Sequence, residues 1–189
     1  MTRAVPRPEV TKACLAAVIE AEARHVRWSD GITMRAAPES LIQSIVAEML
    51  GNTGVQLLLE VSLKDLRAVA SGSILTTNAG GRNGRVDLAV YYKSKMPRFI
   101  IEIKKITNSN SLVADCIRIR ELLKDCPTIQ NGLMLGYTTA AKTSTVETRL
   151  KGVTKTTGAR LVRKIETISV LNKRLDSRYL GAAVYRVDR

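Results

Sequence analysis

Residues 85–104, RVDLAVYYKSKMPRFIIEIK, carry the pattern that decides the fold expected for this chain. Apolar side chains alternate with other residues over 85–92 and largely again over 98–104, and a period of two is typical of β-strands. The polar stretch 93–97 between them predicts a hairpin connection. We therefore expect two neighbouring antiparallel strands.

Two acidic residues fall opposite each other in this predicted hairpin. If the turn is centred between Ser94 and Lys95, the numbers of paired residues sum to 189, which sets Asp87 against Glu102. Their β-carbons would then lie roughly 5 Å apart. Facing carboxylates repel each other and cost stability unless a cation lies between them. The register therefore predicts a divalent metal held by these two side chains.

The chemistry of such a metal indicates a phosphodiester hydrolase. Carboxylate oxygens suit Mg²⁺, for which Mn²⁺ could substitute, and Mg²⁺ needs only one or two carboxylates beside the phosphate of a substrate. A bound metal lowers the pKa of a water and neutralises charge on the phosphate. Lys104 shares the face of Glu102 two residues along. It could orient the attacking water or stabilise developing negative charge.

The surrounding segments predict an α/β fold. We expect one domain over residues 1–189, with a mixed central β-sheet of four to five strands, helices on both sides, a core at 38–137, an N-terminal helix and a basic C-terminal extension. Helical spacing or turn signals predict helices at 9–27, 38–50, 63–70, 111–125 and around 158–175. Short apolar runs predict further strands at 55–61, 131–137 and 182–187.

The pair Val86-Asp87 followed by Glu102-Ile103-Lys104 resembles the PD-(D/E)xK, or restriction-endonuclease-like, nuclease superfamily. The expected order of elements over 38–137 is that of the family, although Val86 replaces the proline of its motif. The resemblance implies a metal-dependent phosphodiesterase that leaves 5′-phosphate ends. It implies that Asp87 and Glu102 are the metal ligands and that Lys104 assists the water.

Many members of that family add an acidic residue from the first core helix. Glu39 is the first candidate here, because it shares a helix face with Ile42 and Val46, although a glutamate in a first turn also simply complements the helix dipole. Glu48 and Glu60 are the alternatives. The stretch Asp115-Cys-Ile-Arg118 in helix 111–125 is similar to the family helix that borders the site.

A strong positive charge indicates a polyanionic partner. Thirty Lys and Arg against seventeen Asp and Glu give a net charge of +13, and the pI is about 10.1. Such an excess favours nucleic acid, because neutralised phosphates release counterions. Arg82 and Arg85 lie in or beside a glycine-rich loop before the Asp87 strand. They could contact phosphates that flank the cleaved bond, or serve only solubility.

Composition excludes several other kinds of site. The single histidine, His25, excludes centres that need two imidazoles, and the three cysteines lack CxxC spacing and are expected to be reduced. No apolar run is long enough to span a bilayer, and no signal peptide is evident, so we expect a cytoplasmic protein without a membrane partner.

These observations predict a magnesium-dependent endonuclease that acts on DNA. DNA is the expected substrate, rather than RNA, only because the family acts more often on DNA. A homodimer is plausible through helix 9–27 or the C-terminal segment, because cutting both strands usually needs two sites. Two alternatives stay open. One is an inactive nucleic-acid-binding module of the same fold, and the other is an interaction protein that binds RNA through its basic tail.

Overall fold

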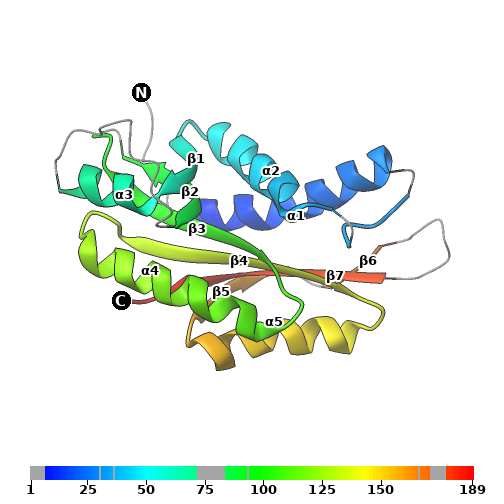
Figure 1. Cartoon of the computed structure of the whole chain (residues 1–189). Coiled ribbons are helices and arrows are strands. Elements are labelled where there is room, and N and C mark those ends of the chain that lie inside the picture. The colour runs from blue at the N-terminus through cyan, green and yellow to red at the C-terminus, as the bar shows by residue number, and fades with distance from the viewer. Residues whose placement is uncertain are drawn as a thin grey trace.

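The chain folds around a mixed β-sheet with helices on both faces (Figure 1). The computed structural model describes residues 7–29, 31–35, 37–71, 84–92, 94–165, 167–170 and 178–189, without the side chains of Ser109 and Ser111. The helices are α1 (Arg7–Trp28), α2 (Glu39–Gly51), α3 (Leu63–Ala70), α4 (Val113–Asp125) and α5 (Thr143–Thr157), with a 3-10 turn, η1 (Ser109–Leu112). The strands are β1 (Gln56–Ser62), β2 (Arg85–Tyr91), β3 (Pro97–Lys105), β4 (Asn131–Ala140), β5 (Arg160–Lys164), β6 (Ile168–Val170) and β7 (Arg178–Val187).

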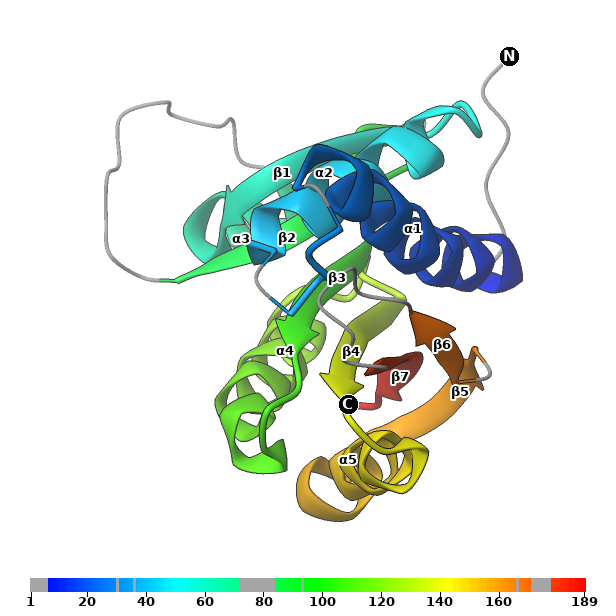
Figure 2. The same ribbon diagram turned by 90° about the vertical axis from the view of Figure 1, so that its right-hand side faces the viewer.

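The described strands form one sheet in the order β1-β2-β3-β4-β7-β5, and β6 pairs with β7 beyond the end of β5. The pair β3–β4 is parallel, and the remaining pairs are antiparallel. The parallel pair needs a crossover, which η1 and α4 provide. The sheet is strongly twisted, so that β1 and β2 turn away from β4 and β7 when it is seen end-on (Figure 2).

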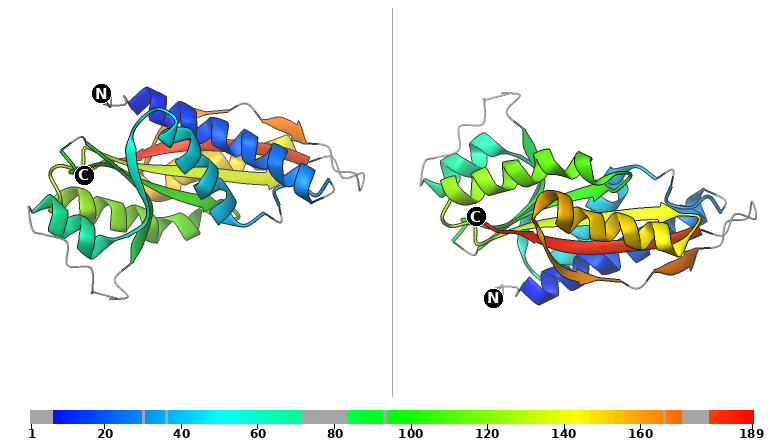
Figure 3. Two further views of the ribbon diagram at one scale, coloured as in Figure 1. Left: turned by 90° about the horizontal axis from the view of Figure 1, so that it is seen from above. Right: turned by 90° about the horizontal axis from the view of Figure 1, so that it is seen from below.

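Two apolar cores fill the space between the sheet and its helices. Helices α1 and α2 cover one face, as the view from above shows, and α3, α4 and α5 cover the other, as the view from below shows (Figure 3). Strand β3 contributes to both cores because its side chains alternate. Phe99, Ile101 and Ile103 pack under α1 and α2, whereas Ile100 packs toward α4. This confirms the predicted mixed α/β sheet with helices on both sides.

The prediction was wrong about the C-terminal part of the chain. Residues 158–175 were expected to be helical, but the described residues of this range contain no helix, and residues 166 and 171–175 lie outside the described residues. The helix is α5, and it ends before Gly158, which adopts a left-handed conformation with φ of +69°. Strands β5 and β6 follow and pair with β7. The expected sheet of four to five strands therefore has seven among the described residues. Every residue of β5 is exposed, so its sequence lacks the alternation that signals a strand.

Two further features agree with the composition. All three cysteines are free and buried, and burial is the main reason that the pKa of each thiol is raised. Within the described ranges, no helix has the length and apolar character that crossing a lipid bilayer requires.

Candidate active site

Strands β2 and β3 stop pairing with each other at the two acidic residues of the motif, Asp87 and Glu102. Strands β2 and β3 follow the predicted register from Val90–Phe99 to Leu88–Ile101, the last pair that they form among the described residues. Beyond it, β2 continues to pair with β1, and β3 continues to pair with β4 as far as Lys105. Asp87 and Glu102 are therefore the first residues past the division of the sheet.

Where β2 and β3 separate, the side chain of Asp87 replaces the backbone acceptor that β2 would otherwise provide. Its Oδ2 accepts a hydrogen bond of 2.6 Å from the backbone N–H of Ile103. In an unbroken antiparallel ladder that N–H would bond to the backbone of β2. The carboxylate is therefore held beside β3, where it reaches Glu102. The two acids lie on the same side of the sheet, as the hairpin register implied.

Glu102 is buried and bonded to an arginine of α4. Only 5% of the residue is exposed. Its Oε1 accepts hydrogen bonds from Arg118, 2.7 Å from Nη2 and 3.2 Å from Nε. The same Nη2 lies 2.7 Å from Oδ1 of Asp115, one turn earlier on α4. Arg118 thus supplies part of the positive charge that the facing carboxylates were expected to need.

The environment shifts the pKa of both acids upward. Burial is the largest cause for Glu102, and the neighbouring charge of Asp87 adds to it, so that the pKa rises from 4.5 to about 8 although Arg118 opposes the change. Burial is also the main cause of the raised pKa of Asp87, with smaller contributions from Glu60 and Glu39. The bond from Ile103 acts in the opposite direction. With a pKa of about 8, Glu102 would be fully ionised at neutral pH only with additional positive charge nearby.

A third acid lies at the end of β3. Glu39 is the first residue of α2, and its Oε1 accepts a hydrogen bond of 2.9 Å from the backbone N–H of Lys105. Its Oε2 lies 3.6 Å from Nζ of Lys104, whose side chain is 37% exposed. The structure therefore brings Lys104 and Glu39 together beside the Asp87–Glu102 pair. An accessible ammonium group can meet a substrate from solvent.

Gln43 also belongs to this site, and the sequence prediction missed it. It follows Glu39 by one helical turn, and its Nε2 donates to Oε1 of Glu60 at 2.7 Å and to the backbone carbonyl of Asp87 at 3.0 Å. Its spacing of four residues from Glu39 is the signal that could have revealed it. Glu60 lies in β1 between Leu59 and Val61, which pair with β2 residues on either side of Asp87, and it has a φ of +52°.

The other candidate residues fall outside this group. Glu48 bonds to Arg24 of α1 at 2.8 Å and 3.1 Å, and it joins the two helices. Arg85 begins β2 and is exposed, two residues before Asp87. Arg82 lies outside the described residues. The functional assignment of each remains a prediction.

The donor set fits magnesium by its chemistry. Within the described residues, no group of three or more His, Cys, Asp or Glu side chains is arranged to hold a metal. Mg²⁺ does not need such a group, because one or two carboxylates suffice when water and a phosphate complete its shell. Asp87 and Glu102 provide hard oxygen donors, and the charge of Asp87 raises the pKa of Glu102, an effect that a cation between them would offset. Both conditions favour a small divalent cation.

Comparisons with known proteins provide no functional assignment for this chain. No family model matches the chain, and no curated protein matches its sequence. One solved structure, a cryo-EM structure of a DrdV–DNA complex, resembles it with a TM-score of 0.36 and 15% identity, over 64% of this chain and 71% of that chain. Similarity this weak carries no argument about what this chain does.

Proposed function

We propose that this chain is a magnesium-dependent nuclease of the PD-(D/E)xK type that hydrolyses DNA phosphodiester bonds. The main support is the position of Asp87 and Glu102 where β2 and β3 separate, with the two carboxylates side by side and the pKa of each raised mainly by burial. Asp87 also accepts a bond from the backbone of Ile103, and Glu102 pairs with Arg118, but neither contact requires the two acids to be neighbours. Apart from α3, which lies between β1 and β2, and the turn η1, the order α2, β1, β2, β3, α4, β4 also agrees with the order that the resemblance implies.

Each residue has a distinct part in the proposed reaction. Asp87 and Glu102 would hold Mg²⁺, which when bound supplies a water of lowered pKa and positive charge for the phosphate. Lys104 would orient the attacking water and stabilise negative charge as it develops. Glu39 would position Lys104 through their ion pair. Gln43 would hold the backbone of Asp87 in place and so keep its carboxylate beside β3.

The test is cleavage of a labelled DNA duplex in the presence of Mg²⁺. We expect Glu102→Gln and Asp87→Asn each to lower the rate by about 100-fold or more, and Lys104→Met to do so by about 100-fold. A matched control is Glu121→Gln, which alters an exposed glutamate of α4. A chelator should stop the reaction. Cleavage by Glu102→Gln at the parent rate, or cleavage in the chelator, would contradict the proposal.

The Arg118–Glu102 pair supports a second candidate, an inactive nucleic-acid-binding module of the same fold. A guanidinium 2.7 Å from the carboxylate can neutralise it permanently, as a metal otherwise would. In that case DNA would bind equally well with Mg²⁺ and with chelator, and no cleavage would occur. Binding without any Mg²⁺-dependent cleavage therefore favours this module over the nuclease. Dimerisation through α1 or the C-terminal strands remains a prediction.

A further inference from the structure

A cleft of about 690 Å³ lies next to the candidate active site, between the ends of β3 and β4 and the start of α5. Among the described residues that line it, five are cations and none is acidic. The cations are Arg35, Lys105, Lys142, Arg149 and Arg178. Four threonines, at positions 107, 138, 139 and 145, add hydroxyl groups to the lining. The composition of this lining is suited to an anionic ligand.

Lys105 connects the cleft to Glu39 of the candidate site. The backbone N–H of Lys105 bonds to Glu39, whereas its Nζ bonds to the backbone carbonyl of Arg35. Lys105 and Arg35 both line the cleft. Along β3, Lys104 and Lys105 follow Glu102, and Lys105 lines the cleft, so the two lysines lie on the route from the acidic pair to the cleft.

The positive charge of the cleft is held by the fold. Arg149 projects from α5, and its Nη1 donates to Thr138 Oγ1 and to the carbonyl of Thr139, each at 3.0 Å. Partial burial is the main cause of the lowered pKa of Lys105, and Arg35 acts in the same direction, whereas Glu39 opposes the change. Arg35 and Lys105 therefore repel one another, and an anion in the cleft would reduce this repulsion further than Glu39 already does.

We propose that the cleft binds consecutive phosphates of a DNA strand that extends from the reacting phosphodiester. The proposal rests on the proposed function for the identity of the ligand. The described lining of the cleft contains no aromatic ring for stacking on a base, and no Asn or Gln for reading a base edge. Lys, Arg and Thr side chains that contact phosphates position the backbone and carry no sequence information. The cleft therefore contributes affinity that is independent of sequence and sensitive to salt.

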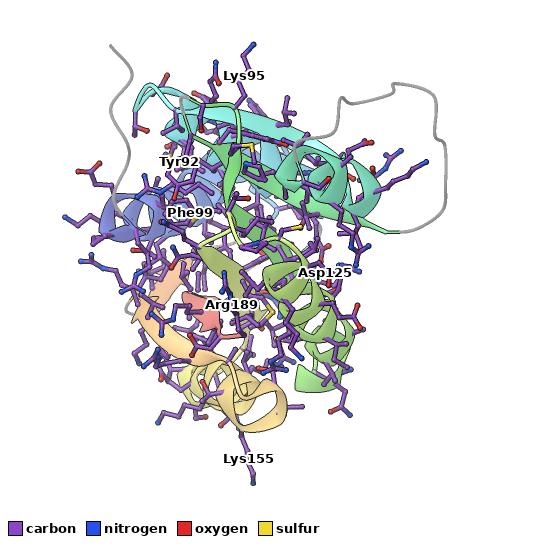
Figure 4. The ribbon with its side chains drawn as sticks, turned by 90° about the vertical axis from the view of Figure 1, so that its left-hand side faces the viewer. Tyr92, Lys95, Phe99, Asp125, Lys155 and Arg189 are labelled. Carbon is purple, nitrogen blue, oxygen red and sulfur yellow. The ribbon has the colours of Figure 1, made fainter. Side chains whose placement is uncertain are left out.

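The test compares two double variants that remove the same charge. Arg35→Gln with Lys142→Gln neutralises two exposed cations of the cleft, and the hydrogen bond from Lys105 to Arg35 survives because it uses the backbone carbonyl. Lys124→Gln with Lys155→Gln neutralises two exposed lysines outside it. Lys155, near the end of α5, points away from the body of the protein (Figure 4). Thermal unfolding of each variant checks that it is folded.

Binding is measured by fluorescence anisotropy of a labelled duplex in chelator, where no cleavage interferes, over a range of salt concentrations. We expect the cleft variant to bind about tenfold more weakly at about 0.1 M salt and to lower the salt slope by about two. The loss should be the same for duplexes of different sequence. The outside variant should change the affinity by less than about threefold.

Three results would overturn the inference. They are an equal loss in both double variants, an unchanged affinity in the cleft variant, and an absence of binding by the parent protein at low salt. Cleavage by the parent protein together with unchanged binding by the cleft variant would refute only the cleft. A selective loss of binding in the cleft variant, with no cleavage by the parent protein, would support the cleft and refute the nuclease.

Discussion

The pKa of Glu102 leads to a measurable dependence of stability on pH. Its value of about 8 in the folded protein exceeds the ordinary 4.5, so between these two values the folded state binds more protons than the unfolded state. Stability contributed by the protonated acid is therefore fully present below about pH 4.5 and is lost as the pH rises through about 8. Glu102→Gln imitates the protonated acid at every pH and removes this loss.

The size of the effect follows from the difference between the ordinary pKa of Glu102 and its pKa in the folded protein. From 4.5 to about 8, at about 1.4 kcal/mol per pH unit, the loss amounts to about 5 kcal/mol. The free energy of unfolding of Glu102→Gln, relative to that of the parent protein, should therefore rise by up to this amount between pH 4.5 and pH 9. The bond between Arg118 and residue 102 adds a constant offset, and the rise with pH is the quantity to test.

Urea unfolding followed by far-UV circular dichroism measures the difference. Fluorescence of Trp28 is less suitable, because this residue is 68% exposed in the folded protein and its surroundings change little on unfolding. Glu121→Gln is the control, since it makes the same replacement at an exposed site of α4. A difference between Glu102→Gln and the parent protein that stays constant from pH 5 to pH 9 would refute the reasoning about burial and the Asp87 charge.

Two predictions concern the fold that positions the site. Gly181→Ala in β7 should lower the free energy of unfolding by about 1–3 kcal/mol, because the new β-carbon would lie 2.3 Å from Val146 of α5. Chemical denaturation measures this, and Gly51→Ala, whose β-carbon would meet no atom within 4 Å, should not share the loss. Ser62→Ala removes the hydroxyl that accepts from the backbone N–H of Asp65 at the start of α3, and we expect a loss of about 1 kcal/mol in the same assay. An unchanged midpoint would mean that this cap does not stabilise the helix.

The central part of the fold could be predicted from the sequence because its signals are local. The alternation in 85–92 and 98–104 depends on which side chains face each core, and the hairpin between them sets the register. That register placed Asp87 opposite Glu102, although the pairing of β2 with β3 ends one residue earlier, at Leu88 and Ile101. The helical spacing of 39–51 and the stop at Gly51 are likewise local properties.

The tertiary structure alone decided the features that depend on distant segments. Strand β5 is exposed along its whole length and exists because its backbone finds hydrogen-bond partners in β7, more than a dozen residues further along the chain. The bond from Arg118 to Glu102 and the bonds of Gln43 join elements whose separation in space is set only when α2 and α4 pack on opposite faces of the sheet. The sequence carries the alternation and the charges, but a contact across the core depends on packing, which no local pattern encodes.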